Sequence, residues 1–65
     1  ASNLVSIFPF GGIAEGVSLS GFRWNLNHET LNPGSTRGLS NEIVDRSGNI
    51  SVQKGVLLVI QPDLY

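Results

Sequence analysis

Few side chains in this sequence belong to the types that carry out covalent chemistry. There is no cysteine, and the single histidine, His28, would be the sole base for a serine nucleophile and cannot form a zinc site alone. His28 stands beside Glu29 in a polar stretch, where a solvent-exposed histidine is the simpler interpretation. The five acidic residues are scattered and do not predict a pair of carboxylates in one cleft. We therefore expect no catalytic residue and no metal site in this chain.

Asn41 is the polar residue whose position raises a question. In a strand, side chains alternate between two faces, so Asn41 would share a face with Leu39 and Ile43, which favour burial. A buried amide without a partner costs about 1–3 kcal/mol. Because an amide both donates and accepts hydrogen bonds, Asn41 could pair with the edge of a heterocycle, and Ser40 could add one bond. The alternative is that Asn41 bonds to the backbone of a neighbouring loop.

Trp24 is the candidate for an aromatic contact with a ligand. It alternates with polar neighbours and shares a strand face with Phe22 and Leu26. One interpretation is a core tryptophan. The other is a stacking surface for a flat ligand, because tryptophan is large, rarely fully buried and carries a polar N–H group.

The stretch from Gly34 to Gly38 could hold an anion through its backbone N–H groups. It lacks the lysine and the following helix of a P-loop. A glycine-bounded loop that leads into a strand is the simpler interpretation.

Short apolar runs separated by glycine-rich turns predict the elements that position these residues. No helical periodicity of useful length occurs, and the turn spacing is typical of an all-β sandwich or barrel of about six strands. The region from 27 to 35 has no period and is expected to be an irregular loop, and the apolar run from 56 to 60 is expected to be a central strand covered on both faces. The expected strands are 4–10, 17–20, 22–26, 39–44, 50–53 and 56–60.

The length of 65 residues allows one small domain. A chain of this size buries only about 60% of its unfolded surface, and without disulfides or metal it is expected to need a partner surface, hence an oligomer. Since the sequence contains no methionine, we expect a piece excised from a longer chain.

The charge and hydropathy patterns exclude several classes of partner. Only 14% of residues are charged, with a net charge of −1 and no basic run, which argues against nucleic acid and an anionic membrane surface. The longest apolar run has five residues, far short of the about 20 that span a bilayer. The lack of cysteine is compatible with a cytoplasmic location.

Three ordered blocks resemble the C-terminal, vitamin B1-binding domain of bacterial thiamin pyrophosphokinases. They read GFRWNL at 21–26, GSTRGLSNE at 34–42 and KGVLLVI at 54–60, and the similarity covers nearly all of residues 1–65. The resemblance implies a small antiparallel, jelly-roll-like β-sandwich that binds thiamin at the interface of a homodimer. The family's enzyme transfers pyrophosphate from ATP to thiamin, giving thiamin diphosphate and AMP. Its ATP and Mg²⁺ belong to an N-terminal α/β domain that this chain lacks, so no cofactor is expected on this chain.

By the same resemblance, three residues match positions near thiamin. Trp24 matches the aromatic of the first block, and Ser40 and Asn41 match the serine and asparagine that contact the aminopyrimidine. Glu42 completes that motif, and Arg37 receives no role. The resemblance implies a full-length enzyme that is a cytoplasmic thiamin diphosphokinase and a fragment that is inactive alone. A non-catalytic β-sandwich interaction module and an unrelated carbohydrate- or heterocycle-binding β domain are the alternatives.

Overall fold

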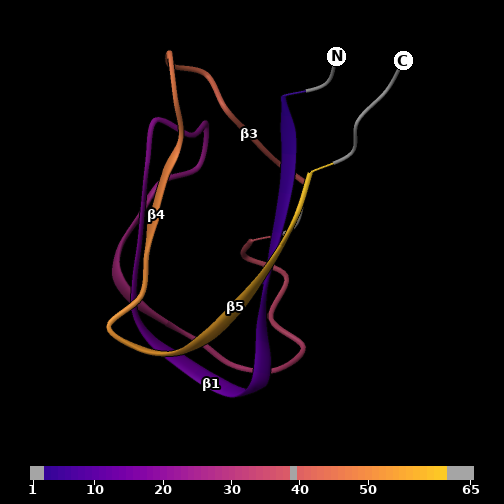
Figure 1. Cartoon of the computed structure of the whole chain (residues 1–65), viewed down its shortest axis with the longest axis vertical. Helices are drawn as coiled ribbons and strands as arrows, with labels where there is room; N and C mark the ends of the chain where they lie inside the picture. Colours follow the sequence, from indigo (N-terminus) through magenta and orange to yellow (C-terminus); the bar gives the residue numbers. More distant parts are fainter. Residues whose placement is uncertain (1–2, 39, 62–65) are drawn as a thin grey trace.

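One long strand pairs with each of the other strands in the described part of the chain (Figure 1). The computed structural model describes residues 3–38 and 40–61. All pairings are antiparallel, which confirms the all-β prediction. Within those residues there is no helix, and so none that could cross a membrane. The strands are β1 (Leu4–Ser20), β2 (Leu26–Leu31), β3 (Asn41–Glu42), β4 (Asn49–Ser51) and β5 (Lys54–Ile60).

Glycines bend β1 where the sequence predicted that it would end. Gly11 and Gly12 have φ angles of 78° and 149°, and the strand continues through them to Ser20. The register with β5 shifts between Phe10 and Glu15, so the extra residues form the bend visible in Figure 1. The first half of β1 pairs with β3 and β5, and the second half pairs with β2 and β4.

The core is small and takes most of its side chains from β1. Both halves of that strand contribute, and the remaining two members come from the turn after it and from the end of β2. Each such side chain contributes about 1.5–3 kcal/mol when it is fully buried, which is partly offset by conformational entropy. The buried hydrophobic residues are Val5, Ile7, Ala14, Val17, Leu19, Phe22 and Leu31.

Two segments exchange the roles that the sequence predicted for them. Residues 22–26 were expected to be a strand, but only Phe22 forms an isolated bridge, with Ile43, before the chain turns. Residues 27–31, expected to be irregular, belong to β2. The polar sequence of β2 did not predict a strand. Much of β2 is exposed to solvent, and Leu31 is its buried residue, so it carries little apolar alternation. The described chain thus has five strands rather than about six.

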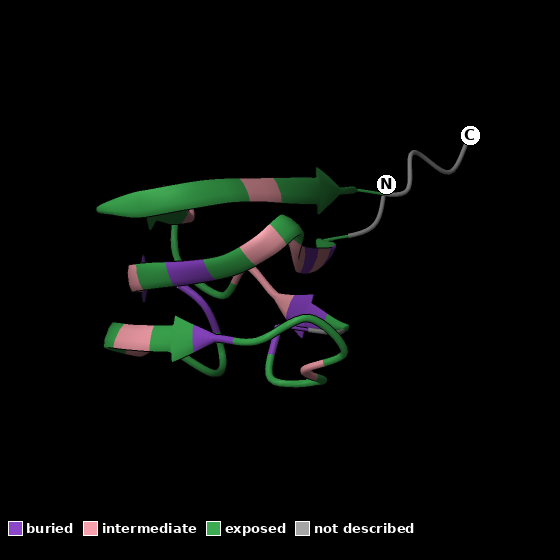
Figure 2. Ribbon diagram, turned by 90° about the horizontal axis from the view of Figure 1, so that it is seen from below, coloured by how far each residue is buried: buried purple, intermediate pink, exposed green. Residues whose placement is uncertain are grey.

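The apolar strand β5 is exposed along most of its length (Figure 2). The prediction that it is covered on both faces is therefore wrong for this chain alone, since β5 pairs only with β1 in the described fold. Its register with β1 places a set of apolar side chains on one side of the two-stranded ribbon, here called the outer face. The outer face consists of Phe8, Phe10, Val56, Leu58 and Ile60.

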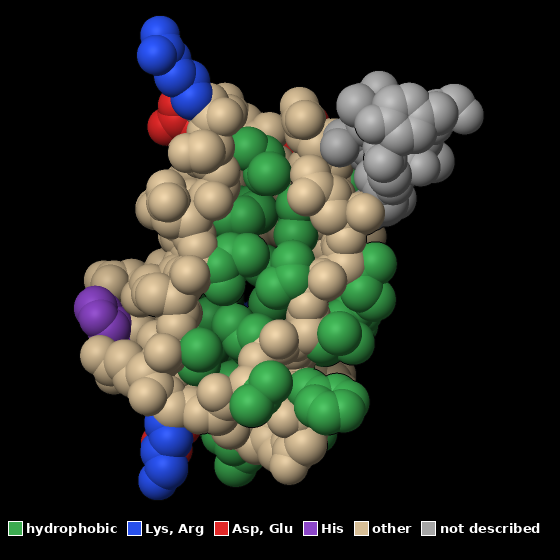
Figure 3. Space-filling view, in the orientation of Figure 1, with side chains coloured by type: hydrophobic (Ala, Val, Ile, Leu, Met, Phe, Trp, Pro, Cys, Tyr) green, Lys and Arg blue, Asp and Glu red, His purple; other side chains and the backbone are tan. Residues whose placement is uncertain are grey.

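Four of the five side chains of the outer face are 45–64% exposed. Hydrophobic side chains also cover much of the side of the molecule drawn in Figure 3, where the charged side chains project near its margins. Exposed apolar areas of this kind are typical of surfaces that contact another protein, a membrane or a ligand.

We expect Gly21→Ala to destabilise the fold much more than Gly34→Ala. Both residues have positive φ, 80° and 86°, so each substitution incurs the left-handed backbone cost of about 1–2 kcal/mol. A Cβ at Gly21 would also overlap the carbonyl oxygen of Ser47, whereas one at Gly34 would meet open space. Urea denaturation should show a loss at least about 2 kcal/mol larger for Gly21→Ala. Equal losses would contradict the close backbone approach at Gly21.

Candidate functional site

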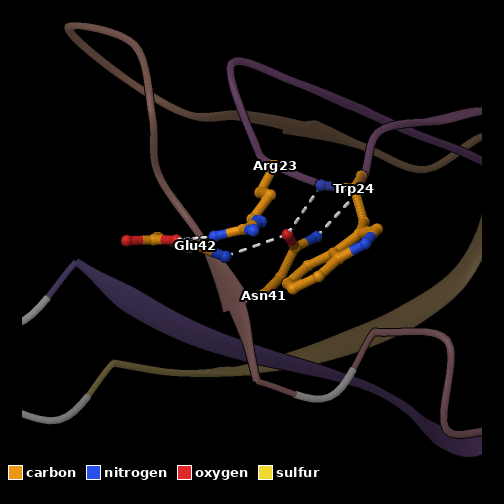
Figure 4. Close-up of polar contacts among 4 residues, drawn as sticks. All are labelled: Arg23, Trp24, Asn41 and Glu42. Atoms are coloured by element: carbon orange, nitrogen blue, oxygen red, sulfur yellow. Dashed lines mark hydrogen bonds and ion pairs between the residues drawn. The ribbon is translucent and has the colours of Figure 1, made fainter.

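The three predicted site residues come from two segments that lie side by side (Figure 4). Trp24 belongs to the turn at residues 21–25, between β1 and β2. Asn41 opens β3 and pairs with Val5 of β1, and Ser40 precedes it. The structure thus brings together residues that are about 17 positions apart in the sequence.

Asn41 is buried, as strand alternation predicted, and its partner is the backbone of Trp24. Only 1% of Asn41 is exposed. Its Nδ2 donates to the carbonyl oxygen of Trp24 at 2.8 Å, and its Oδ1 accepts from the Trp24 N–H at 3.1 Å. The Glu42 N–H donates to the same Oδ1 at 2.9 Å. Leu39, which was expected to share the face of Asn41, lies outside the described residues.

These bonds decide between the two interpretations of the amide. A carboxamide oxygen has two lone pairs, and the N–H groups of Trp24 and Glu42 engage both. The bond to a neighbouring loop's backbone is therefore confirmed, and the oxygen of Asn41 needs no heterocycle to satisfy it. One N–H of Asn41 remains beyond the bond to Trp24.

Trp24 is 55% exposed, so the interpretation of a core tryptophan is wrong. The ζ-carbon of Arg23 lies 5.2 Å from the centroid of the indole ring, within the range of a cation–π contact. Arg23 Nη1 also lies 3.5 Å from Glu42 Oε1, in an ion pair whose side chains are 62% and 39% exposed. The site therefore offers an aromatic surface that already tolerates a cation beside it.

The turn that carries Trp24 is fixed by its backbone. Its first residues bond to β3 and to the segment after it. The Arg23 N–H donates to the carbonyl oxygen of Glu42 at 2.8 Å, and the Val44 N–H donates to that of Gly21 at 3.0 Å. Asn25 Oδ1 accepts from the Phe22 N–H at 2.9 Å. Sequence reasoning missed Asn25, although asparagine commonly closes a turn onto a nearby backbone N–H.

Ser40 has a backbone conformation that is uncommon outside glycine. Its φ is 52°, its side chain is exposed, and its N–H donates to Ser6 Oγ at 3.1 Å. Left-handed non-glycine residues cost about 1–3 kcal/mol and cluster at functional sites. The strain presents Ser40 to solvent immediately before the buried Asn41.

The other candidates form no site in the described residues. Arg37 pairs with Glu29 at 3.1 Å, and its N–H donates to Ser35 Oγ, so the 34–38 stretch bonds within its own surroundings. His28 is exposed, as expected, but it lies in β2 rather than in a loop. No group of three or more His, Cys, Asp or Glu side chains within residues 3–38 and 40–61 could hold a metal ion.

Comparison with known proteins places the chain in a family. The family model of the thiamin pyrophosphokinase vitamin B1-binding domain matches residues 1–57. The chain belongs to this family. The matched range includes Trp24, Ser40 and Asn41, and it ends within β5.

This vitamin B1-binding domain is similar to part of a longer protein, thiamine pyrophosphokinase of Bacillus subtilis. The chain is 35% identical over 57 residues to thiamine pyrophosphokinase of Bacillus subtilis. This match covers 88% of this chain and 27% of the relative. The crystal structure of thiamine pyrophosphokinase from Bacillus subtilis matches with a TM-score of 0.84 and 33% identity, over 89% of this chain and 27% of that one. The chain therefore spans about a quarter of the length of either relative.

We expect Arg23→Gln to loosen the surroundings of Trp24 without much loss of stability. Exposed ion pairs and cation–π contacts contribute about 0–1 kcal/mol each, so the unfolding free energy should fall by less than about 1 kcal/mol. Acrylamide quenching of Trp24 fluorescence should rise. Arg37→Gln, which breaks the ion pair with Glu29, is the matched control and should leave the quenching unchanged. A large loss of stability with unchanged quenching would contradict this description of Arg23.

Proposed function

We propose that this chain is the thiamin-binding part of a thiamin pyrophosphokinase. The observation that carries the proposal is the exposed indole of Trp24, held on a fixed turn in a chain of the vitamin B1-binding family. An exposed tryptophan anchored through its backbone is suited to stacking against a flat ring.

The chemistry of thiamin fits the residues of the site. Its thiazolium ring is a cation, which aromatic faces attract by about 0.5–2 kcal/mol. Its aminopyrimidine is flat and carries hydrogen-bonding groups at its edge. In our proposal Trp24 stacks against the ligand, the Ser40 hydroxyl bonds to the pyrimidine edge, and Asn41 contributes at most its remaining N–H.

The proposed reaction of the whole enzyme transfers the pyrophosphoryl group of ATP. The hydroxyl oxygen of thiamin bonds to the β-phosphorus, the bond from that phosphorus to the α-phosphate oxygen breaks, and AMP leaves as the hydroxyl proton is released. Residues 3–38 and 40–61 contain no group of three or more His, Cys, Asp or Glu side chains that could hold a metal ion. We therefore assign ATP and Mg²⁺ to an N-terminal α/β domain of the same enzyme and derive no step through them here.

We further propose that the outer face packs against a second copy of this chain in a cytoplasmic homodimer. A small core and an exposed apolar ribbon leave the isolated fold with surface that water disfavours. The outer face carries no charged side chain, and its sheet geometry suits a second sheet packed at about 10 Å. Such packing would complete the predicted β-sandwich, while other surfaces would meet the N-terminal domain.

In the intact enzyme, we expect Trp24→Ala to raise the KM for thiamin by about 2- to 30-fold, the factor that corresponds to loss of a cation–π contact. The KM for ATP should change by less than about 2-fold, because ATP is assigned elsewhere. Ser40→Ala should raise the thiamin KM by about 2- to 10-fold, the effect of one hydrogen bond.

The control for both variants is His28→Ala, an exposed residue of β2 outside the site, which should leave both KM values unchanged. Equal changes in the KM for thiamin and for ATP, or no change for Trp24→Ala, would contradict the proposed thiamin site.

Leu58→Lys should convert the dimer to a monomer. A lysine in the middle of the outer face would place a charge in an apolar interface, which disfavours association. Light scattering coupled to gel filtration should show the intact protein's mass halved. Val44→Lys is the matched control, since Val44 is 60% exposed, bonds to Gly21 and does not belong to the outer face. An unchanged mass for Leu58→Lys would exclude the outer face as the dimer interface.

A further inference from the structure

We propose that Asn41 is a positioning residue, which fixes the backbone of Trp24 so that the indole is held ready for the ligand. This inference rests on the proposed function, because it assigns Asn41 a role in the same thiamin site. It differs from the direct ring contact that the sequence suggested, since the residue acts through Trp24.

The carboxamide of Asn41 imitates a strand residue. It donates to the carbonyl oxygen of Trp24 and accepts from the Trp24 N–H, the exchange that two residues of a hydrogen-bonded antiparallel pair make. The turn at residues 21–25 has no strand of its own at Trp24. The side chain of Asn41 thus supplies this position with the backbone bonds that a sheet would otherwise provide.

The anchor itself is rigidly placed. Asn41 pairs with Val5 of β1, one of the buried core residues, and is almost completely buried. Its oxygen is also fixed by the Glu42 N–H. The bonds to Trp24 therefore run from a buried side chain to the backbone of an exposed residue (Figure 4).

Within residues 3–38 and 40–61, the cation–π contact of the indole is with Arg23, which is itself exposed and paired with Glu42 at 3.5 Å. Such exposed pairs hold side chains weakly. The direction of the indole thus depends on the backbone of Trp24, which Asn41 fixes.

Fixing the turn in advance favours binding. A side chain that becomes ordered only on binding weakens affinity by about 2- to 10-fold, and a turn that orders with it adds to this. Direct contact with the ligand is the weaker explanation for Asn41, because both lone pairs of its oxygen are already engaged.

The test is a double-mutant cycle in the intact protein that contains this chain. Asn41→Ala removes the bonds to Trp24, and Asn41→Asp retains acceptor oxygens but loses the donor to the Trp24 carbonyl. Asn27→Ala is the matched control, since the Asn27 amide is exposed and its Oδ1 contacts the ring of His28. Each variant is made with Trp24 intact and with Trp24→Ala, and thiamin affinity is measured by calorimetry.

A second readout needs no ligand. Fluorine NMR of protein labelled with 5-fluorotryptophan reports the mobility of the indole, and the signal of Trp24 is assigned by its loss in Trp24→Phe. A direct ligand contact by Asn41 would not move this readout.

We expect Asn41→Ala and Asn41→Asp to weaken thiamin binding by about 5- to 20-fold when Trp24 is present and by less than about 2-fold in the Trp24→Ala background. The signal of Trp24 should sharpen in both variants without ligand, and Asn27→Ala should change neither readout. An effect that persists in full without Trp24, an unchanged indole signal, or loss of folding in both variants would overturn the positioning role. If Trp24→Ala alone leaves thiamin affinity unchanged, the proposed function fails instead, and the indole signal still decides the role of Asn41.

Discussion

The hydrogen bonds between the buried Asn41 carboxamide and the backbone of Trp24 join the two segments on which the site depends. Without them, the turn at 21–25 would leave polar backbone groups beside the core that Phe22 enters. Unsatisfied groups of this kind cost about 1–3 kcal/mol each, so the amide stabilises the fold and the site together. This explains why an amide, rather than an aliphatic side chain, occupies this buried position.

The second constraint is size. A chain of 65 residues with its core gathered around one bent strand cannot cover all of its apolar side chains. The fold places the surplus on the outer face of the β1–β5 ribbon, whereas Trp24 lies on the turn that follows β1. In our proposals, ligand binding and assembly therefore use different parts of the chain.

Sequence patterns predicted those features that depend on local alternation. The all-β class and the burial of Asn41 follow from period-two spacing, and the structure confirms both. The family resemblance rests on blocks of sequence, and the matched family model confirms it.

Features set by distant partners could not be predicted in this way. The partner of Asn41 is a backbone 17 residues earlier, whose position depends on a turn that the alternation of Phe22, Trp24 and Leu26 disguised as a strand. The apolar run of β5 predicted a strand covered on both faces, but β5 is exposed along most of its length in this chain. Side-chain amides that replace backbone partners leave no periodic signal.

The most direct test of the account is a crystal structure of the intact protein with thiamin bound. The account predicts a ring of thiamin stacked on the indole of Trp24, with Asn41 Oδ1 still accepting from the N–H groups of Trp24 and Glu42 as it does without ligand. Thiamin bound away from Trp24, or an Asn41 amide that has left Trp24 to pair with the pyrimidine, would contradict it.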